Sequence, residues 1–358
     1  MRALLPLILA IGLLPTSALY AATPPPPRTL SGELQGAPWR LDVPAQWSGE
    51  LVMLAHGYEP VGVPRETPMA AADSTQALLD AGYAVAQSAY SSQGWAVADA
   101  VADMERLRQH VLDELTHVRR TWMLGFSMGG AVTVASLERH PQGYAGGISL
   151  CGANLPGDVL AGELLTTLVA FDYFFPNAEG LPAGGLLSSG AGALPQMALY
   201  QGIAAALATR PAQAAQLATR LQVAPDALAG AISLHALVLH ELAQRAGGMP
   251  VGNSGIVYSG FGDDAAFNAG VQRVQGTAAG QTYVRDQLAL KGALQRPLVI
   301  QFNHDDPSIV PRMQTVYPQL VARAGSGSKL HVLPPVGEGH CGFSGAQVVD
   351  ALKAASAH

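Results

Sequence analysis

The chain has 358 residues, of which 49% are hydrophobic and 13% are charged, and its formal net charge is −6. Soluble domains are typically about 25% charged, so this composition excludes the highly charged, disordered class of protein. The net negative charge, without a basic stripe, also excludes recognition of DNA or RNA phosphates. We therefore expect a folded protein with a large core and no nucleic-acid partner.

The N-terminus predicts export from the cytoplasm. Arg2 precedes an apolar run at residues 4–14, and small residues follow at 18–22. This order is typical of a secretory signal peptide, so we expect residues 1–22 to be removed and residues 23–29 to form a stiff proline-rich leader. The apolar run is shorter than the roughly 20 residues of a membrane span. We expect a secreted or periplasmic protein without stable membrane insertion, with an uncleaved anchor as the alternative.

Short apolar runs after the leader predict strands. An entry hairpin is expected around Gly36, and the helical period of residues 96–115 predicts a helix. Runs of four to eight apolar residues ended by glycine are typical of strands buried on both faces. Strands alternating with helices predict an α/β protein with a mostly parallel sheet and helices on both faces. The runs are residues 51–55, 82–90, 121–127, 146–152, 297–303 and 329–335.

This alternation stops between residues 154 and 295. The segment is rich in Ala, Leu and Gly and predicts several helices, of which residues 224–248 form the clearest. Apolar residues lie on both faces of that helix, so we expect it to be covered on both sides. It contains His235 and His240, which we interpret as packed helix residues rather than catalytic ones.

The strand pattern resumes at Pro297, which predicts that the helices interrupt a single sheet. We expect a core formed by residues 30–153 and 296–358. Residues 154–295 are then a helical lid inserted into this core rather than a separate module.

The stretch "MLGFSMGGAV" at residues 123–132 contains a G-x-S-x-G match around Ser127. With 40 glycines in the chain, the match alone is weak, and its flanks decide its weight. An apolar strand end precedes it and a helical pattern follows it. Strand, tight turn and helix are the arrangement that exposes a serine hydroxyl at the edge of a sheet. The N–H of Met128, at the start of the helix, would then point at negative charge developing on a substrate oxygen.

A serine hydroxyl needs a base that accepts its proton and an acid that orients the base. Both types follow downstream, in "NHDDPSIVP" after one predicted strand and in "GEGHCGF" after the next. Together with "HGY" at residues 56–58, these motifs resemble the α/β-hydrolase superfamily. The order Ser127, Asp306, His340 is the chain order of that superfamily.

The resemblance implies the α/β-hydrolase fold and a role for each matching residue. Ser127 is the expected nucleophile, His340 the general base, and Asp306 the acid that holds the imidazole, with its neighbour Asp305 as the alternative. The N–H of Tyr58 is the expected second oxyanion donor. The implied activity is a serine hydrolase that cleaves small or oligomeric carboxylic esters and needs no cofactor.

Other activities remain open on the same residues. A serine peptidase of the prolyl type uses the same triad, and an acyltransferase differs only in whether an alcohol replaces water. A non-catalytic binding protein would ordinarily lack one of the three residues. We expect no metal, because His304 and the two aspartates after it lack a second set of ligands at a suitable spacing.

The two cysteines are Cys151, at the end of a predicted strand, and Cys341, directly after His340. In the fold that the resemblance implies, both lie near the active site, and an exported protein meets an oxidising compartment. We expect a disulfide between them, with two buried thiols as the alternative. The "HC" pair resembles the tannase and feruloyl esterase family, which places the partner cysteine directly before the serine. Here that position is Phe126.

Aromatic residues supply the candidate substrate contacts. Phe171, Tyr173 and Phe174 open the predicted lid and either line an acyl or aryl pocket or belong to the core. Tyr90 and Trp95 lie on loops after strands and are further candidates.

Overall fold

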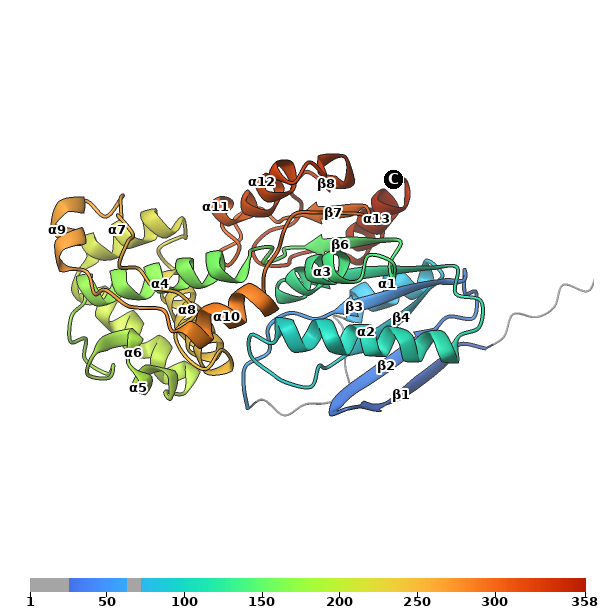
Figure 1. Ribbon diagram of the computed structural model, residues 1–358, viewed down its shortest axis with the longest axis horizontal. Helices are drawn as coiled ribbons and strands as arrows, with labels where there is room; N and C mark the ends of the chain where they lie inside the picture. The colour runs from blue at the N-terminus through green and yellow to red at the C-terminus, as the bar shows by residue number, and fades with distance from the viewer. Residues whose placement is uncertain (1–25, 63–71) are drawn as a thin grey trace, which may run out of the picture.

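The computed structural model describes residues 26–62 and 72–358 (Figure 1). The predicted signal peptide, residues 1–22, and the start of the predicted leader lie outside the described residues. The last two residues of the predicted leader, Arg28 and Thr29, belong to the first strand instead. The reason is tertiary pairing, because Arg28 lies opposite Val43 on the second strand and the hydroxyl of Thr29 donates to Asp42.

The architecture is a single eight-stranded sheet, as expected. Its strand order is β1-β2-β4-β3-β5-β6-β7-β8. The first two strands form the predicted antiparallel hairpin. The other six, β3 to β8, run parallel to one another. The strands are β1 (Arg28–Leu34), β2 (Ala37–Val43), β3 (Glu50–Ala55), β4 (Tyr83–Ser88), β5 (Arg120–Phe126), β6 (Gly146–Leu150), β7 (Leu298–Gln301) and β8 (Leu330–Val332).

Helices cover both faces of the sheet. Along β3, Leu51 and Met53 belong to one apolar cluster and Val52 and Leu54 to another, since successive side chains point to opposite faces. Helices α2 and α3 pack on the first face, and α1 and α13 on the second. The helices of the core are α1 (Ala72–Asp80), α2 (Val97–Glu114), α3 (Met128–Arg139), α11 (Pro311–Gln314), α12 (Val316–Arg323), η2 (Gly327–Lys329) and α13 (Gly345–Ser356).

A run of helices separates β6 from β7, where the lid was expected. This helical segment gathers beyond the carboxyl ends of the parallel strands (Figure 1). Among the described helices, none is both long enough and apolar enough to cross a membrane. The segment consists of α4 (Gly157–Phe174), η1 (Gly185–Leu187), α5 (Ser189–Gly192), α6 (Gln196–Thr209), α7 (Pro211–Leu221), α8 (Leu228–Arg245), α9 (Asp264–Gly270) and α10 (Ala278–Gln287).

Helix α8 is the centre of this segment, and its predicted double coverage is confirmed. It packs against α4, α5 and α6. Ile232, Leu239 and Leu242 on one face are fully buried, while Leu234 and Leu237 on the other are half-buried against the same apolar cluster.

The turn between β5 and α3 brings two backbones into contact. A Cβ atom on Gly129 would lie 2.2 Å from the carbonyl oxygen of Ala55, at the end of β3. A Cβ atom on Gly125 would lie 2.0 Å from the carbonyl oxygen of Gly129. No side chain fits at either distance, so glycine is required for α3 to start directly over the sheet.

We predict that Gly129→Ala costs at least about 3 kcal/mol of unfolding free energy, because rigid backbone rather than a movable side chain opposes the added methyl group. Urea unfolding followed by circular dichroism measures the change. Gly162→Ala is the matched control, since a Cβ atom at Gly162 on α4 has nothing within 4 Å. It should raise stability by about 0.5 to 1 kcal/mol. Equal effects of the two substitutions would contradict the packing argument.

Candidate active site

Ser127 occupies the turn between β5 and α3 in a strained backbone conformation. Its φ is 55° and its ψ is −119°, a region that residues other than glycine rarely adopt. Hydrogen bonds hold the turn in place. The N–H of Ser127 donates to the carbonyl of Leu150 at the end of β6, and its own carbonyl accepts from Gly130 and Ala153. The sheet edge therefore fixes the direction of the Ser127 side chain.

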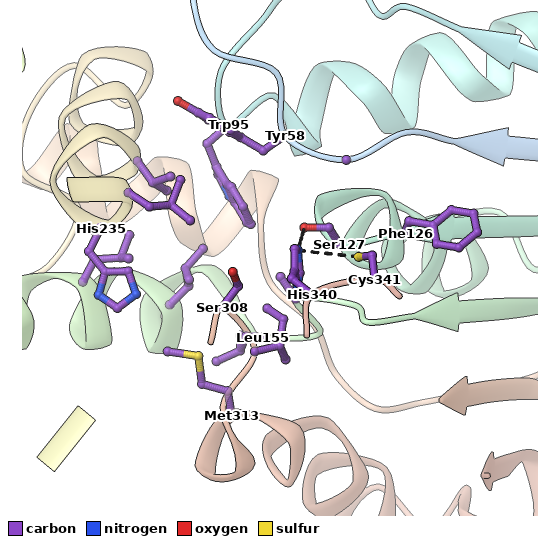
Figure 2. Close-up of a pocket in the computed structure, with 17 residues that line it drawn as sticks. Tyr58, Trp95, Phe126, Ser127, Leu155, His235, Ser308, Met313, His340 and Cys341 are labelled. Carbon is purple, nitrogen blue, oxygen red and sulfur yellow. Dashed lines mark hydrogen bonds between the residues drawn. The ribbon is translucent and has the colours of Figure 1, made fainter. Parts of the chain in front are cut away.

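Three side chains that are far apart in the sequence form one chain of hydrogen bonds (Figure 2). The Nε2 atom of His340 lies 2.8 Å from Oγ of Ser127. Its Nδ1 atom lies 2.9 and 3.0 Å from the two carboxyl oxygens of Asp306. A carboxylate only accepts hydrogen bonds, so Nδ1 carries the proton and Nε2 presents a lone pair to the serine hydroxyl.

The two neighbouring aspartates have different environments. The side chain of Asp306 is fully buried and also accepts hydrogen bonds from the N–H groups of Ser308 and Ile309, at 2.8 and 3.0 Å. Asp305 is exposed and has a positive φ of 51°. Of the two residues that the sequence left as alternatives, Asp306 is the one that contacts His340.

The loops after β7 and β8 are paired by their backbones. The N–H of His304 donates to the carbonyl of Gly337, and the N–H of Gly339 donates back to the carbonyl of His304. The side-chain amide of Asn303 adds a bond to the carbonyl of Val336. This pairing carries Asp306 and His340 together. In the described ranges 26–62 and 72–358, no three His, Cys, Asp or Glu side chains gather in a way that could hold a metal ion.

A disulfide joins Cys151 to Cys341, which confirms the expected bridge. Cys151 directly follows β6, and Cys341 directly follows His340, so the bridge ties the histidine loop to the sheet. One disulfide sulfur lies 3.6 Å from Nε2 of His340. This sulfur has no hydrogen to donate, so the contact limits the position of the ring by packing. The residue directly before Ser127 is Phe126, so the partner of Cys341 is not at the position that the tannase and feruloyl esterase family uses.

Two backbone amides lie beside Ser127. Met128 is the first residue of α3, so its N–H is one of those that a helix N-terminus leaves without an intrahelical acceptor. On the other side, a Cβ atom on Gly57 would lie 3.3 Å from Cβ of Ser127. The loop that carries the N–H of Tyr58 therefore passes close to the serine.

The side chain of Tyr58 connects this loop to the helical segment. Its hydroxyl donates to Oε1 of Glu241 on α8 at 2.7 Å, and the N–H of Trp95 donates to Oε2 at 2.9 Å. Burial raises the pKa of Glu241, while these two donors favour its charged form. No motif in the sequence singles out Glu241, because its role depends on how α8 lies over the core.

A cavity of about 400 Å³ opens beside Ser127 and His340. Both the core and the helical segment line it, and most of the lining is apolar (Figure 2). Of the aromatic candidates, Trp95 lies in its wall. The apolar side chains that line it include Trp95, Leu155, Leu160, Leu164, Leu234, Val238, Ile309 and Met313.

His235 and Ser308 also line this cavity, although the sequence did not single out either as a site residue. His235 packs in α8 as expected and is only 9% exposed. Burial, together with the nearby positive charge of Arg312, lowers the pKa of His235 to about 4. Its imidazole is therefore neutral near pH 7.

Tyr90 does not line the cavity. It is 1% exposed, its hydroxyl donates to the carbonyl of His56 at 3.0 Å, and its ring stacks on the ring of His56. The residue supports the strand end that precedes Gly57 and Tyr58.

The aromatic residues of α4 also lie outside the cavity. Phe171, Tyr173 and Phe174 pack inside the helical segment, and the latter two contact the ring of Phe267 on α9 at centroid distances of 4.9 and 5.8 Å. Of the two interpretations that the sequence left open, their positions fit the core. The rings of Tyr173 and Phe174 pack between α4 and α9, and the ring of Phe171 stacks on that of Phe175.

Three features define the topology of the chain. They are the strand order, the strand–turn–helix at Ser127, and the loops after β7 and β8 that carry Asp306 and His340. The chain has the α/β-hydrolase fold.

No protein-family model and no curated protein matches the chain in sequence. Among solved structures it is similar to Est1E from Butyrivibrio proteoclasticus, at 11% identity over 92% of this chain and 99% of that one, with a TM-score of 0.45. It is also similar to a thermostable carboxyl esterase from Bacillus coagulans, at 13% identity over 88% and 91% of the two chains, with a TM-score of 0.43. A probable hydrolytic enzyme from Pseudomonas aeruginosa is 14% identical over 93% of each chain, with a TM-score of 0.40.

We predict that replacing both Cys151 and Cys341 by alanine lowers the free energy of unfolding by about 5 kcal/mol, since the bridge closes a loop of 190 residues. Denaturant unfolding measures the loss. Reducing agent should bring the unsubstituted protein down to the stability of the double variant and leave that variant unchanged. A reductant effect of equal size on both proteins would contradict the prediction, as would two free thiols in the unreduced, denatured protein.

Proposed function

We propose that this chain is a serine hydrolase that cleaves carboxylic esters through an acyl-enzyme. One observation carries the proposal. A continuous run of hydrogen bonds links Asp306 through His340 to the hydroxyl of Ser127, at the edge of a largely apolar cavity. This geometry matches the requirements for an activated serine nucleophile.

In the first half of the proposed reaction, Oγ of Ser127 attacks the carbonyl carbon of the ester. Nε2 of His340 accepts the hydroxyl proton as the new C–O bond forms. The imidazolium then protonates the leaving alcohol as the tetrahedral intermediate collapses to the acyl-enzyme. Asp306 keeps the proton on Nδ1 and stabilises the positive charge of the ring.

The oxyanion of the tetrahedral intermediate needs donors that are already in place. The N–H groups of Met128 and Tyr58 are suited to this role because both lie beside Ser127 on fixed backbone. The hydrogen bonds that Tyr58 and Trp95 donate to Glu241 support the orientation of the Tyr58 loop.

In the second half, a water molecule gives a proton to His340 and attacks the acyl carbon. The ring returns that proton to Oγ of Ser127 as the acid leaves. The leucine, valine, isoleucine and methionine side chains of the cavity favour an apolar acyl chain. We therefore propose an ester hydrolase rather than a peptidase.

The site also bears on where the protein acts. Disulfides persist in oxidising compartments, and the bridge between Cys151 and Cys341 fits a secreted or periplasmic protein. The signal-like pattern of residues 1–22 supports the same proposal.

We predict that Ser127→Ala lowers kcat for p-nitrophenyl butyrate by about 10⁴-fold, because the nucleophile is lost while the cavity remains. Initial rates of nitrophenolate release measure the effect. Labelling by a fluorophosphonate probe should disappear in the same variant, and a thermal melt checks that it is folded. Activity within tenfold of the unsubstituted enzyme would overturn the proposed function.

The neighbouring aspartates provide a matched pair of substitutions. We predict that Asp306→Asn lowers kcat by about 10⁴-fold, because an amide that donates to Nδ1 favours the wrong tautomer of His340. Asp305→Asn should change kcat by less than about threefold, since its exposed side chain has no bond to His340. The reverse order of effects, from the same nitrophenolate assay, would show that Asp305 is the acid.

A further inference from the structure

One polar ring interrupts the apolar wall of the cavity. His235 lies on α8 with Leu234 and Val238 as its neighbours in the lining. Figure 2 shows the imidazole on the side of the helical segment, away from the Ser127–His340 pair. An apolar side chain would complete this wall at lower cost, because burying a polar group without a partner costs about 1 to 3 kcal/mol.

The hydrogen bonds of the ring account for only one of its two nitrogens. Nδ1 of His235 is 2.8 Å from the hydroxyl oxygen of Thr167 on α4. Within residues 26–62 and 72–358, this is the one hydrogen bond that the ring makes. Nε2 therefore remains available to a group inside the cavity.

A hydroxyl group is the partner that fits Nε2 in either protonation pattern. The hydroxyl of Thr167 also lies 3.1 Å from the carbonyl oxygen of Glu163 and can donate to it. Thr167 then accepts from Nδ1–H of His235, and Nε2 is an acceptor. In the other tautomer Nε2 is a donor. A hydroxyl both donates and accepts, so it suits both cases, whereas a carboxylate or an ammonium suits only one.

The charge of the site also favours a neutral group. Burial keeps the imidazole of His235 uncharged near pH 7. The nearby guanidinium of Arg312 is already paired with the carboxylate of Glu163, at 2.9 Å. An anionic ligand would therefore meet no unpaired positive charge beside the ring.

The acyl portion of the ester is the part that reaches this ring. The leaving oxygen must lie at Nε2 of His340, which protonates it, and the His340 side chain is 29% exposed. The alcohol portion can thus leave towards solvent, while the acyl portion extends from Ser127 into the cavity that His235 lines.

We propose that His235 binds a hydroxyl group at the distal end of the acyl chain, so that the enzyme prefers esters of hydroxy acids. This inference rests on the proposed esterase function. It adds a specificity-determining residue and the chemical class of the substrate.

Two series of p-nitrophenyl esters test the proposal, one of unbranched alkanoates from acetyl to octanoyl and one of the ω-hydroxy acids of the same lengths. The quantity compared is kcat/KM for the hydroxy ester divided by kcat/KM for the plain ester of equal length. In the unsubstituted enzyme this ratio should rise to a maximum at one length. In His235→Leu the ratio at that length should fall about tenfold, the worth of one hydrogen bond to a buried group, and the acetyl rate should stay unchanged.

His240→Leu is the matched control, because His240 lies on the same helix, bonds to the carbonyl of Leu186, and does not line the cavity. It should leave the ratio as it is at every length. Titration with a fluorophosphonate counts active sites, so a loss of folded protein does not alter the ratio. If His235→Leu fails to fold, His235→Gln, which keeps a polar group, should retain more of the preference than His235→Ala.

A ratio that does not depend on residue 235 at any length would overturn the inference and leave Ser127-dependent hydrolysis standing. A preference that appears only with ω-hydroxy alcohols as the leaving group would overturn the assignment to the acyl chain. Ester hydrolysis that persists in Ser127→Ala would instead overturn the proposed function itself.

Discussion

The site depends on a steric constraint at the end of β5. Gly125 and Gly129 let α3 begin in contact with the sheet, with only backbone between them. The chain must then reverse direction at Ser127, which adopts its positive φ because bonds to Leu150 and Ala153 hold both sides of the turn. The strain is local, and the rigid sheet around it makes it tolerable. The hydroxyl is thereby fixed at hydrogen-bond distance from His340.

Parallel pairing brings the other groups to the same edge. Strands β6, β7 and β8 are neighbours, so the loops that follow them begin side by side. Asp306 comes from the loop after β7 and His340 from the loop after β8. The disulfide runs from Cys151, after β6, to Cys341, and so spans the end of the intervening strand. Covalent and backbone bonds together limit the freedom of a loop whose imidazole must stay within reach of Ser127.

The sequence predicted what local pattern and chain order determine. Ser127 has a motif with the correct flanks, and His340 follows a predicted strand. The sequence favoured Asp306 and kept Asp305 as the alternative, because the backbone conformation that turns one carboxylate outward and the other inward is set by the paired loops. Aromatic composition likewise could not separate core from pocket, since Phe174 packs on Phe267, which arrives about 90 residues later in the chain. His235 had only the pattern of a packed helix.

The helical segment and the core together form the wall of the cavity. Helix α8 contributes His235 to the cavity and Glu241 to the loop of Tyr58. A half-buried carboxylate is stabilised by donors, and the donors to Glu241 come from Tyr58 and Trp95 in the core. Withdrawing α8 would leave that carboxylate without these partners and would release the backbone next to Ser127. The position of the helix therefore couples the shape of the cavity to the path of the Tyr58 loop.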